Sequence, residues 1–278
     1  MKKINRRSFL AAAGLTAAAL ALTACGGSAS STASSTASSA ASSEAASTSA
    51  AAELTTVEAG KLTMATNAAF PPYEMTTDAG EFEGIDIETA KAIAEKLGLE
   101  LQIDDMDFDA ALLSVQQGKA DIVMAGVTVT DERKAVMDFS DSYATGIQSI
   151  IVPEGSDITS PDDLAGKKIG TQRGTTGYIY CSDDFGDDAV VAYDDGLTAV
   201  QALNNGQVDA VVIDNAPAKE FVAANPGLVI LDTSYAEEDY AIGLAKGSAL
   251  EDAVNAALEE LKADGTLQSI VDKYITAE

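Results

Sequence analysis

The chain has 278 residues, with 17 Lys and Arg against 44 Asp and Glu, a formal net charge of −27, no His and two Cys. So acidic a protein is repelled by nucleic acids and by anionic lipid headgroups, which excludes nucleic-acid binding. The lack of His excludes Ser-His-Asp and Cys-His catalysis and His-ligated zinc. The common glycine-rich phosphate-binding motifs are also missing from the sequence. We therefore expect no metal and no cofactor, and are left with an acidic binding protein or an enzyme that works with carboxylates alone.

Residues 1–24 have the pattern of an export signal. Lys and Arg precede an apolar run from Phe9 to Leu22, which is too short for a comfortable membrane span. The run leads into Thr23-Ala24-Cys25, and this end resembles the lipobox of bacterial lipoproteins. Cys25 is therefore the expected lipidation site, with an ordinary secretory signal and a chance Cys as the alternative. Arg6-Arg7 also resembles part of a twin-arginine signal, so the export route stays open.

Residues 25–52 consist almost entirely of Ser, Ala, Thr and Gly, and Glu44 is their one charged residue. Such a segment buries too little apolar surface to offset the entropy lost on ordering. We expect a flexible Ser/Ala-rich tether with a reach of roughly 30 Å. It would hold a globular domain at the outer face of the bacterial cytoplasmic membrane through a lipid anchor only.

An internal echo marks the rest of the chain. A helical pattern that ends at Gly118 is followed by Asp121 and an apolar strand. The same order returns about ninety residues later, with Gly206, then Asp209 and a second apolar strand. In each case glycine is suited to end the helix, and the strand is apolar enough to be buried in a parallel sheet.

Short β-branched runs alternate with amphipathic helical patterns throughout this region, which is typical of an α/β fold. The strands expected over 61–66 and 167–171 also resemble each other. We infer two lobes of related topology. Residues 53–148 form the first part of lobe 1, residues 149–240 form lobe 2, and residues 241–278 return to complete lobe 1.

Two further strands are expected to cross between the lobes, over 148–152 and 240–245. Ser160, followed by Pro and two Asp, predicts a helix start at the entrance to the second lobe. A helix is expected over 248–263, where apolar residues recur at helical spacing. Two crossover strands between two lobes form a hinge, with a ligand cleft between the lobes.

In open α/β sheets, ligands bind beyond the carboxyl ends of the strands. The loops that leave the four matched strands are therefore the candidate site: 67–73, 125–133, 172–176 and 213–214.

Arg133 breaks a local rule in one of these loops. Thr130 is a good helix N-cap, but the third helical position carries a cation where an acid or Gln is favoured. A guanidinium beside helix amides suits a carboxylate or a phosphate. Asp214 ends an apolar strand, where a lone carboxylate needs a cation. Together, Arg133 and Asp214 suit the two charges of an α-amino acid.

From about residue 58 to 275 the chain resembles the family 3 extracellular solute-binding proteins, the polar amino-acid receptors of ATP-driven importers. The segments that carry the resemblance are Phe70-Pro71-Pro72-Tyr73-Glu74, Gly84-Ile85-Asp86-Ile87-Glu88, Gln117-Gly118-Lys119-Ala120-Asp121, Ala125–Arg133, Asp138-Phe139-Ser140-Asp141, Gly174-Thr175-Thr176 and Asp209–Asp214. The resemblance implies the type II periplasmic binding protein fold, in which two α/β lobes are joined by a two-strand hinge.

The resemblance also implies roles for individual residues. Arg133 would bind the ligand's α-carboxylate, helped by Thr128, Thr175 and Thr176. A surface ion pair is the alternative for Arg133, and simple helix capping is the alternative for the two later threonines.

On the same grounds, Asp214 and the carbonyl of Gly126 would bind the α-ammonium, unless Asp214 only caps a helix. Phe70 would stack on the ligand's side chain. Core packing is the alternative for Phe70 and for Tyr73. The remaining residues of the expected side-chain end are Asn67, Tyr73 and Gln172.

The expected function is the substrate-binding component of an amino-acid ABC importer, a monomer without catalytic activity that delivers its ligand to the membrane permease and its ATPase subunits. A receptor that serves a signalling partner and a carboxylate-dependent enzyme of the same fold are the alternatives. Asn67 and Gln172 are neutral, which favours an uncharged polar ligand such as glutamine or cystine. Arg173 would favour an acidic ligand if its side chain turned inward.

Overall fold

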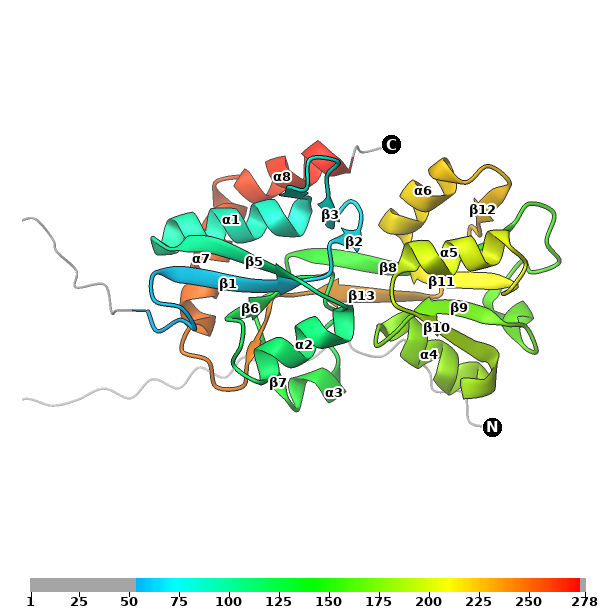
Figure 1. Ribbon diagram of the computed structural model, residues 1–278, viewed down its shortest axis with the longest axis horizontal. Helices are drawn as coiled ribbons and strands as arrows, with labels where there is room; N and C mark the ends of the chain where they lie inside the picture. The colour runs from blue at the N-terminus through cyan, green and yellow to red at the C-terminus, as the bar shows by residue number, and fades with distance from the viewer. Residues whose placement is uncertain (1–53, 276–278) are drawn as a thin grey trace, which may run out of the picture. The chain divides into compact units, whose positions relative to one another are not determined.

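The computed structural model describes residues 54–275, which belong to one compact unit. The expected export signal, the tether and Cys25 lie outside the described residues. Between 54 and 275 the chain forms two α/β lobes, each built around its own sheet (Figure 1). None of the helices in this range is both long and apolar enough to cross a membrane.

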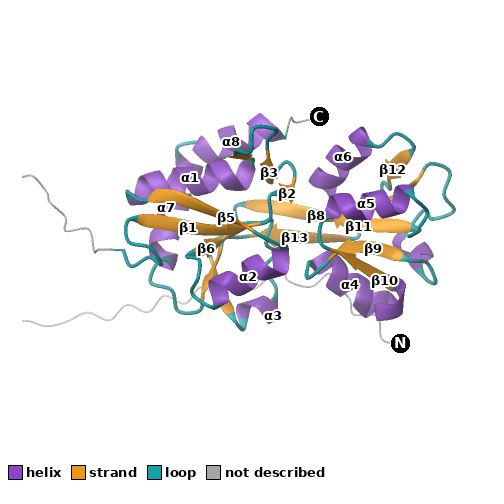
Figure 2. Cartoon of the chain, in the orientation of Figure 1, coloured by secondary structure: helices purple, strands orange, loops and turns teal. Residues whose placement is uncertain are grey.

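The first lobe contains a five-stranded sheet in the order β5-β1-β6-β14-β7. Its strands are β1 (Lys61–Thr66), β5 (Glu100–Asp105), β6 (Ile122–Val123), β7 (Met137–Phe139) and β14 (Gly243–Ala245). A small separate sheet holds β2 (Ala69–Phe70), β3 (Glu74–Thr76) and β4 (Phe82–Glu83). The helices are α1 (Ile85–Leu97), α2 (Phe108–Gln116), α3 (Asp131–Lys134), α7 (Glu251–Ala263) and α8 (Thr266–Tyr274). Helices α1, α7 and α8 pack on one another, and α2 lies on the other face of the sheet (Figure 2).

The second lobe contains a sheet in the order β10-β9-β11-β8-β12, and β13 also pairs with β8. Its strands are β8 (Ala144–Pro153), β9 (Ile169–Gln172), β10 (Val190–Tyr193), β11 (Ala210–Asp214), β12 (Leu228–Ile230) and β13 (Ala236–Tyr240). Its helical segments are η1 (Pro161–Leu164), α4 (Thr176–Phe185), η2 (Asp187–Ala189), α5 (Gly196–Asn204) and α6 (Asn215–Ala224).

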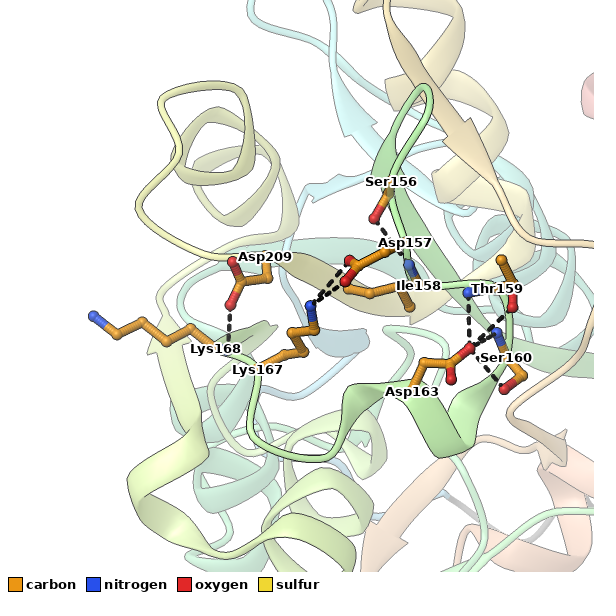
Figure 3. Close-up of polar contacts among 9 residues, drawn as sticks. All are labelled: Ser156, Asp157, Ile158, Thr159, Ser160, Asp163, Lys167, Lys168 and Asp209. Atoms are coloured by element: carbon orange, nitrogen blue, oxygen red, sulfur yellow. Dashed lines mark hydrogen bonds and ion pairs between the residues drawn. The ribbon is translucent and has the colours of Figure 1, made fainter.

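The two aspartates of the internal echo, Asp121 and Asp209, make equivalent hydrogen bonds in the two lobes. Asp121 accepts a hydrogen bond from the backbone N–H of Thr63 at 2.8 Å, and Asp209 accepts one from that of Lys168 at 2.7 Å. Each aspartate stands directly before one strand, β6 or β11, and ties it to the neighbouring parallel strand, β1 or β9. The repeated sequence therefore corresponds to a repeated contact between neighbouring parallel strands. Figure 3 shows this contact in the second lobe, between Asp209 and Lys168.

The entrance to the second lobe is a polar turn (Figure 3). Asp163 Oδ2 accepts hydrogen bonds of 3.0 Å from the backbone and hydroxyl groups of Thr159 and Ser160. This reciprocal cap agrees with the predicted helix start, but the helix is a single 3₁₀ turn, η1. It ends before Gly166, whose φ of +79° is a left-handed conformation that favours glycine.

Two antiparallel strands, β8 and β13, connect the lobes; β8 contains the predicted crossover 148–152, whereas β13 shares only Tyr240 with the predicted crossover 240–245. The strand expected over 240–245 is in fact two strands. Tyr240 ends β13 and pairs with Ala144, whereas Gly243 begins β14 and pairs with Val123 of the first-lobe sheet. The break arises because the chain changes sheets at this point.

Candidate functional site

The ends of the parallel strands of the two lobes face each other across a cleft. Strand β1 ends next to Asn67, and β9 ends at Gln172. Gln172 Nε2 donates a 2.8 Å hydrogen bond to Asn67 Oδ1, which joins the two lobes directly.

A pocket lies in this cleft, and nine of the ten predicted ligand-binding residues line it. Its walls come from both lobes and from the two connecting strands. The lining residues are Asn67, Phe70, Glu74, Phe108, Ala125, Gly126, Thr128, Arg133, Gln148, Gln172, Thr175, Thr176, Val212, Ile213, Asp214 and Tyr240.

Arg133 is the cation of the pocket and is only 8% exposed. Thr130 caps α3 by accepting from the backbone N–H of Arg133 at 3.1 Å, as the sequence predicted. The guanidinium is turned into the cleft, where Nη1 donates to the Thr128 carbonyl at 2.8 Å and Nη2 to the Gly174 carbonyl at 3.1 Å. It also lies over the ring of Phe108, 5.4 Å from the ring centre. These contacts hold a buried positive charge in one orientation.

Hydroxyl groups of both lobes surround this cation. Thr128 Oγ1 and Thr176 Oγ1 lie 3.4 Å apart across the cleft, and both residues are buried. Thr175 caps α4: its Oγ1 accepts from the backbone N–H of Tyr178 at 3.3 Å and donates to the Gln172 carbonyl at 2.8 Å. The capping alternative for Thr175 is therefore what its hydroxyl does. Backbone N–H groups at the start of α4 add positive potential on this side of the pocket.

Asp214 is the anion on the other side of the pocket and is 2% exposed. Its Oδ2 accepts from the Ile147 backbone N–H at 2.7 Å, and its Oδ1 caps α6 by accepting from the Ala216 N–H at 2.9 Å. Tyr240 also hydrogen-bonds to this carboxylate. Burial raises the pKa of Asp214 to about 6, although these hydrogen bonds oppose the shift. Asp214 thus caps a helix and also lines the pocket.

Gly126 and Phe70 form the floor of the pocket. Gly126 has φ +54°, and a Cβ there would lie 2.9 Å from the Phe70 ring, so only glycine fits without strain. The Gly126 N–H donates to Asp86 Oδ2 at 3.0 Å. Asp86 also accepts from the Tyr143 hydroxyl at 2.8 Å, next to the start of β8.

Tyr73 differs from its expected position. Its ring stacks on Phe70 with 5.7 Å between ring centres and meets Tyr240 edge-on at 5.4 Å. It lines a neighbouring hollow together with Ile147 and Ala216. The reason is the tight turn between β2 and β3, which pairs Phe70 with Glu74 and directs the intervening Tyr73 inward.

Arg173 faces away from the cleft. Its side chain is exposed and forms a long contact, 3.4 Å, with Asp194. It therefore does not contribute a positive charge to the pocket.

Seven lining residues are not among the predicted ligand-binding residues, and the four of them with polar or aromatic side chains are Phe108, Gln148, Tyr240 and Glu74. Phe108 follows β5, which pairs in parallel with β1, so the rule about strand ends would have found it had β5 been included. Gln148 and Tyr240 lie within the connecting strands, where no loop signal exists.

Glu74 is a fully buried acid in the pocket wall. None of the hydrogen-bond donors in the described part of the chain reaches either of its oxygens, and the facing Asp86 Oδ1 also lacks a donor. Burial and the nearby charges of Asp86 and Asp105 raise the pKa of Glu74 well above its ordinary value. Burial likewise raises the pKa of Asp86 to about 6. A proton held on one Glu74 oxygen and donated to Asp86 would give each of the two groups one hydrogen bond.

The arrangement suits a small zwitterion. A cation with hydroxyl and amide donors on one side can hold a carboxylate, and a carboxylate on the other side can hold an ammonium group. Charge-assisted hydrogen bonds of this kind contribute about 1.5–3 kcal/mol each. Phe70 and Phe108 add flat apolar surface for an aliphatic chain.

Comparisons with known proteins agree with this geometry. Residues 62–277 match the profile of the bacterial extracellular solute-binding proteins, family 3. The chain is 32% identical to a probable histidine-binding protein of Neisseria gonorrhoeae, over 99% of this chain and 98% of that protein. It is 33% identical to the L-cystine-binding protein TcyJ of Escherichia coli K12, over 80% and 85% of the two chains. A solved structure of an ancestral arginine-binding protein bound to glutamine superposes with a TM-score of 0.75 at 42% identity, covering 78% of this chain and 99% of that one.

Proposed function

Because the chain belongs to the bacterial extracellular solute-binding proteins of family 3, we propose that it binds an L-amino acid in the cleft and delivers it to an ABC importer. Its relatives are solute-binding proteins and not enzymes, and the chain is likewise a binding protein. The observation that carries the proposal is the pair of buried, opposite charges, Arg133 and Asp214, that open into one pocket.

The carboxylate of the ligand is assigned to Arg133. Thr128 and Thr176 contribute hydroxyl groups from opposite lobes, and Thr175 contributes its backbone at the start of α4. A ligand held by groups of both lobes stabilises the closed arrangement, because opening the cleft would break its hydrogen bonds.

The ammonium group is assigned to Asp214 and to the carbonyl of Gly126. The ligand's side chain then lies between Phe70 and Phe108, and its tip reaches the far end of the pocket. We assign Asn67 and Gln172 to that end, while Tyr73 supports Phe70 from behind.

For the ligand we propose a basic amino acid, with arginine first. Glu74 lines the pocket, is fully buried, and has Asp86 and Asp105 as its main charged neighbours. A guanidinium there would supply the positive charge that these acids lack. This differs from the uncharged ligand that the sequence suggested, because the contribution of Glu74 depends on the fold.

Glutamine is the second candidate. Asn67 and Gln172 present neutral amides that match a ligand amide, and the glutamine-bound ancestral protein is similar to this chain. The second oxygen of a protonated Glu74 can accept a hydrogen bond from the amide of such a neutral ligand.

The proposed location rests on the family and on the residues at the start of the chain. Members of the family are extracellular binding proteins. We infer that residues 1–24 are an export signal, that Cys25 carries a lipid, and that residues 25–52 tether a monomer to the outer face of the cytoplasmic membrane near its permease. Replacing Cys25 with Ala should move the protein from the membrane fraction to the soluble fraction, and unchanged membrane retention would contradict the anchor.

The lobes would move about β8 and β13. On this proposal, residues 53–148 and 241–278 form one body and residues 149–240 form the other. The ligand joins them by contacting both.

Calorimetric titration of the refolded protein tests the proposal. L-arginine, L-histidine, L-glutamine and L-cystine are titrated separately, and we expect arginine to bind most tightly. E74Q should weaken arginine binding by about tenfold or more and leave glutamine binding within about threefold, because only arginine brings a charge to Glu74. Binding of none of the four would contradict the proposed function.

A further inference from the structure

Glu238 is a buried carboxylate on β13, one of the two strands that connect the lobes. It is 6% exposed, whereas its neighbours Glu237 and Asp239 are exposed. Its Oε2 accepts hydrogen bonds from Thr128 Oγ1 at 3.1 Å and from Gln148 Nε2 at 2.9 Å. Its Oε1 has no hydrogen-bond partner among the described residues. A buried carboxylate with an unsatisfied oxygen costs free energy, so an apolar or amide side chain would serve packing better.

Glu238 acts on the two groups assigned to the ligand's carboxylate. Burial lowers the pKa of Arg133, and the negative charge of Glu238 is the largest influence that opposes this shift. A carboxylate only accepts hydrogen bonds, so Thr128 donates its single hydroxyl proton to Glu238. Thr128 Oγ1 is then able only to accept from Thr176, 3.4 Å away across the cleft.

We propose that Glu238 competes with the ligand's carboxylate for Arg133 and Thr128 and thereby weakens the hold of the cleft on its ligand. This inference rests on the proposed function. A ligand carboxylate beside Arg133 places a second negative charge in a buried region that already contains one. It must also draw the Thr128 proton away from Glu238.

The position of Glu238 gives this competition a use. A delivery protein has to release its ligand. As the ligand leaves, the Glu238 carboxylate again accepts the hydrogen bond from Thr128 Oγ1 and again pairs electrostatically with Arg133. Glu238 is thus a positioning residue that does not itself line the pocket, and it sets affinity through two groups that do.

The test is E238Q, with E237Q as the matched control. Both remove one negative charge from β13, but only Glu238 is buried beside Thr128. The probes are L-arginine, L-histidine and L-glutamine together with their carboxamides, in which the ligand's negative charge is absent. Affinities are measured calorimetrically, and thermal unfolding shows that each variant is folded.

E238Q should bind the free amino acids about tenfold more tightly or more, because like charges at close range in a protein repel by more than 1.4 kcal/mol. The carboxamides should gain much less, because they can accept from Thr128 but bring no second negative charge, and E237Q should match the unmodified protein. Since a merely structural role would alter acids and carboxamides alike, this contrast identifies the competition.

E238Q that binds the free amino acids equally or more weakly, while the unmodified protein binds them, overturns this inference and leaves the proposed function intact. If neither protein binds any of the probes, both are overturned. Should E238Q fail to fold, E238D gives the answer. It keeps the charge but withdraws it from Thr128, so it should tighten binding severalfold, and unchanged affinity would overturn the inference.

Discussion

Asp214→Asn is the change whose effect can be worked out most fully. The amide oxygen of Asn can still accept from the Ala216 N–H and cap α6, whereas its NH2 group cannot accept from the Ile147 N–H, so the variant keeps the cap but loses the charge and one backbone hydrogen bond. Leaving a buried ligand ammonium without its counter-charge costs about 2–5 kcal/mol. Because one hydrogen-bond acceptor is retained, we expect the lower end, a loss of roughly 30- to 150-fold in affinity near pH 7.5.

The pH dependence of the same variant gives a sharper result. Burial raises the pKa of Asp214 to about 6, and the ammonium requires the ionised form. Below pH 6 the unmodified protein must lose a proton to bind, so its affinity falls about tenfold per pH unit from this group. Asn does not titrate, so the ratio of the ligand affinities of the two proteins should fall by about tenfold between pH 7.5 and pH 5.

Calorimetric titration at pH 5, 6, 7 and 7.5 measures both quantities. Comparing the two proteins at each pH removes the contribution of other titrating groups, including Asp86. Equal affinities at pH 7.5, or a ratio that stays constant down to pH 5, would refute the assignment of the ammonium to Asp214.

Three further changes test the rest of the site. R133K keeps the charge but loses the fork that donates to the Thr128 and Gly174 carbonyls, so binding should weaken by about tenfold or more in calorimetry; unchanged affinity would argue against Arg133. G146A places a Cβ 2.4 Å from the Tyr240 ring and should lower the melting temperature by roughly 2–12 °C, from about 1–3 kcal/mol at 2–4 °C per kcal/mol; an unshifted melting curve would contradict this. For E74Q, burial raises the pKa of Glu74, so the unmodified protein loses stability as pH rises through that pKa and the variant does not. Melting curves without ligand should therefore coincide near pH 4 and separate in favour of E74Q at pH 8, and a separation that is independent of pH would contradict the shift.

The two opposite charges of the site, Arg133 and Asp214, were predictable because each residue breaks a local rule. Arg133 is a cation at the start of a helix, and Asp214 is an acid at the end of an apolar strand. The loops after matched strands located Thr128 and Thr176 in the same way. The echoed Asp121 and Asp209 predicted two related lobes because each holds the same contact in its own sheet.

The residues missed have physical reasons in common. Glu238 lies inside a strand that alternates buried and exposed positions, and Gln148 begins a run of five buried residues in β8. In neither strand does the sequence show which polar side chain points inward. Glu74 is four residues from Phe70, yet its charge matters only because the hairpin turns it against Asp86. Tyr73 was misplaced because one turn separates a ring that lines the pocket from a ring that supports it.

The claim that the cleft clamps both charges of an amino acid is tested most directly by thermal shift on protein that has been unfolded and refolded to remove bound ligand. The panel contains the L-amino acids and, for each one that binds, its N-acetyl and carboxamide derivatives. A ligand at 100 times its Kd adds about 2.7 kcal/mol, or roughly 5–11 °C at 2–4 °C per kcal/mol. The account predicts a shift of that size with one or a few L-amino acids and a much smaller shift when either charge is blocked. No shift with any L-amino acid, or equal shifts with the blocked derivatives, would contradict it.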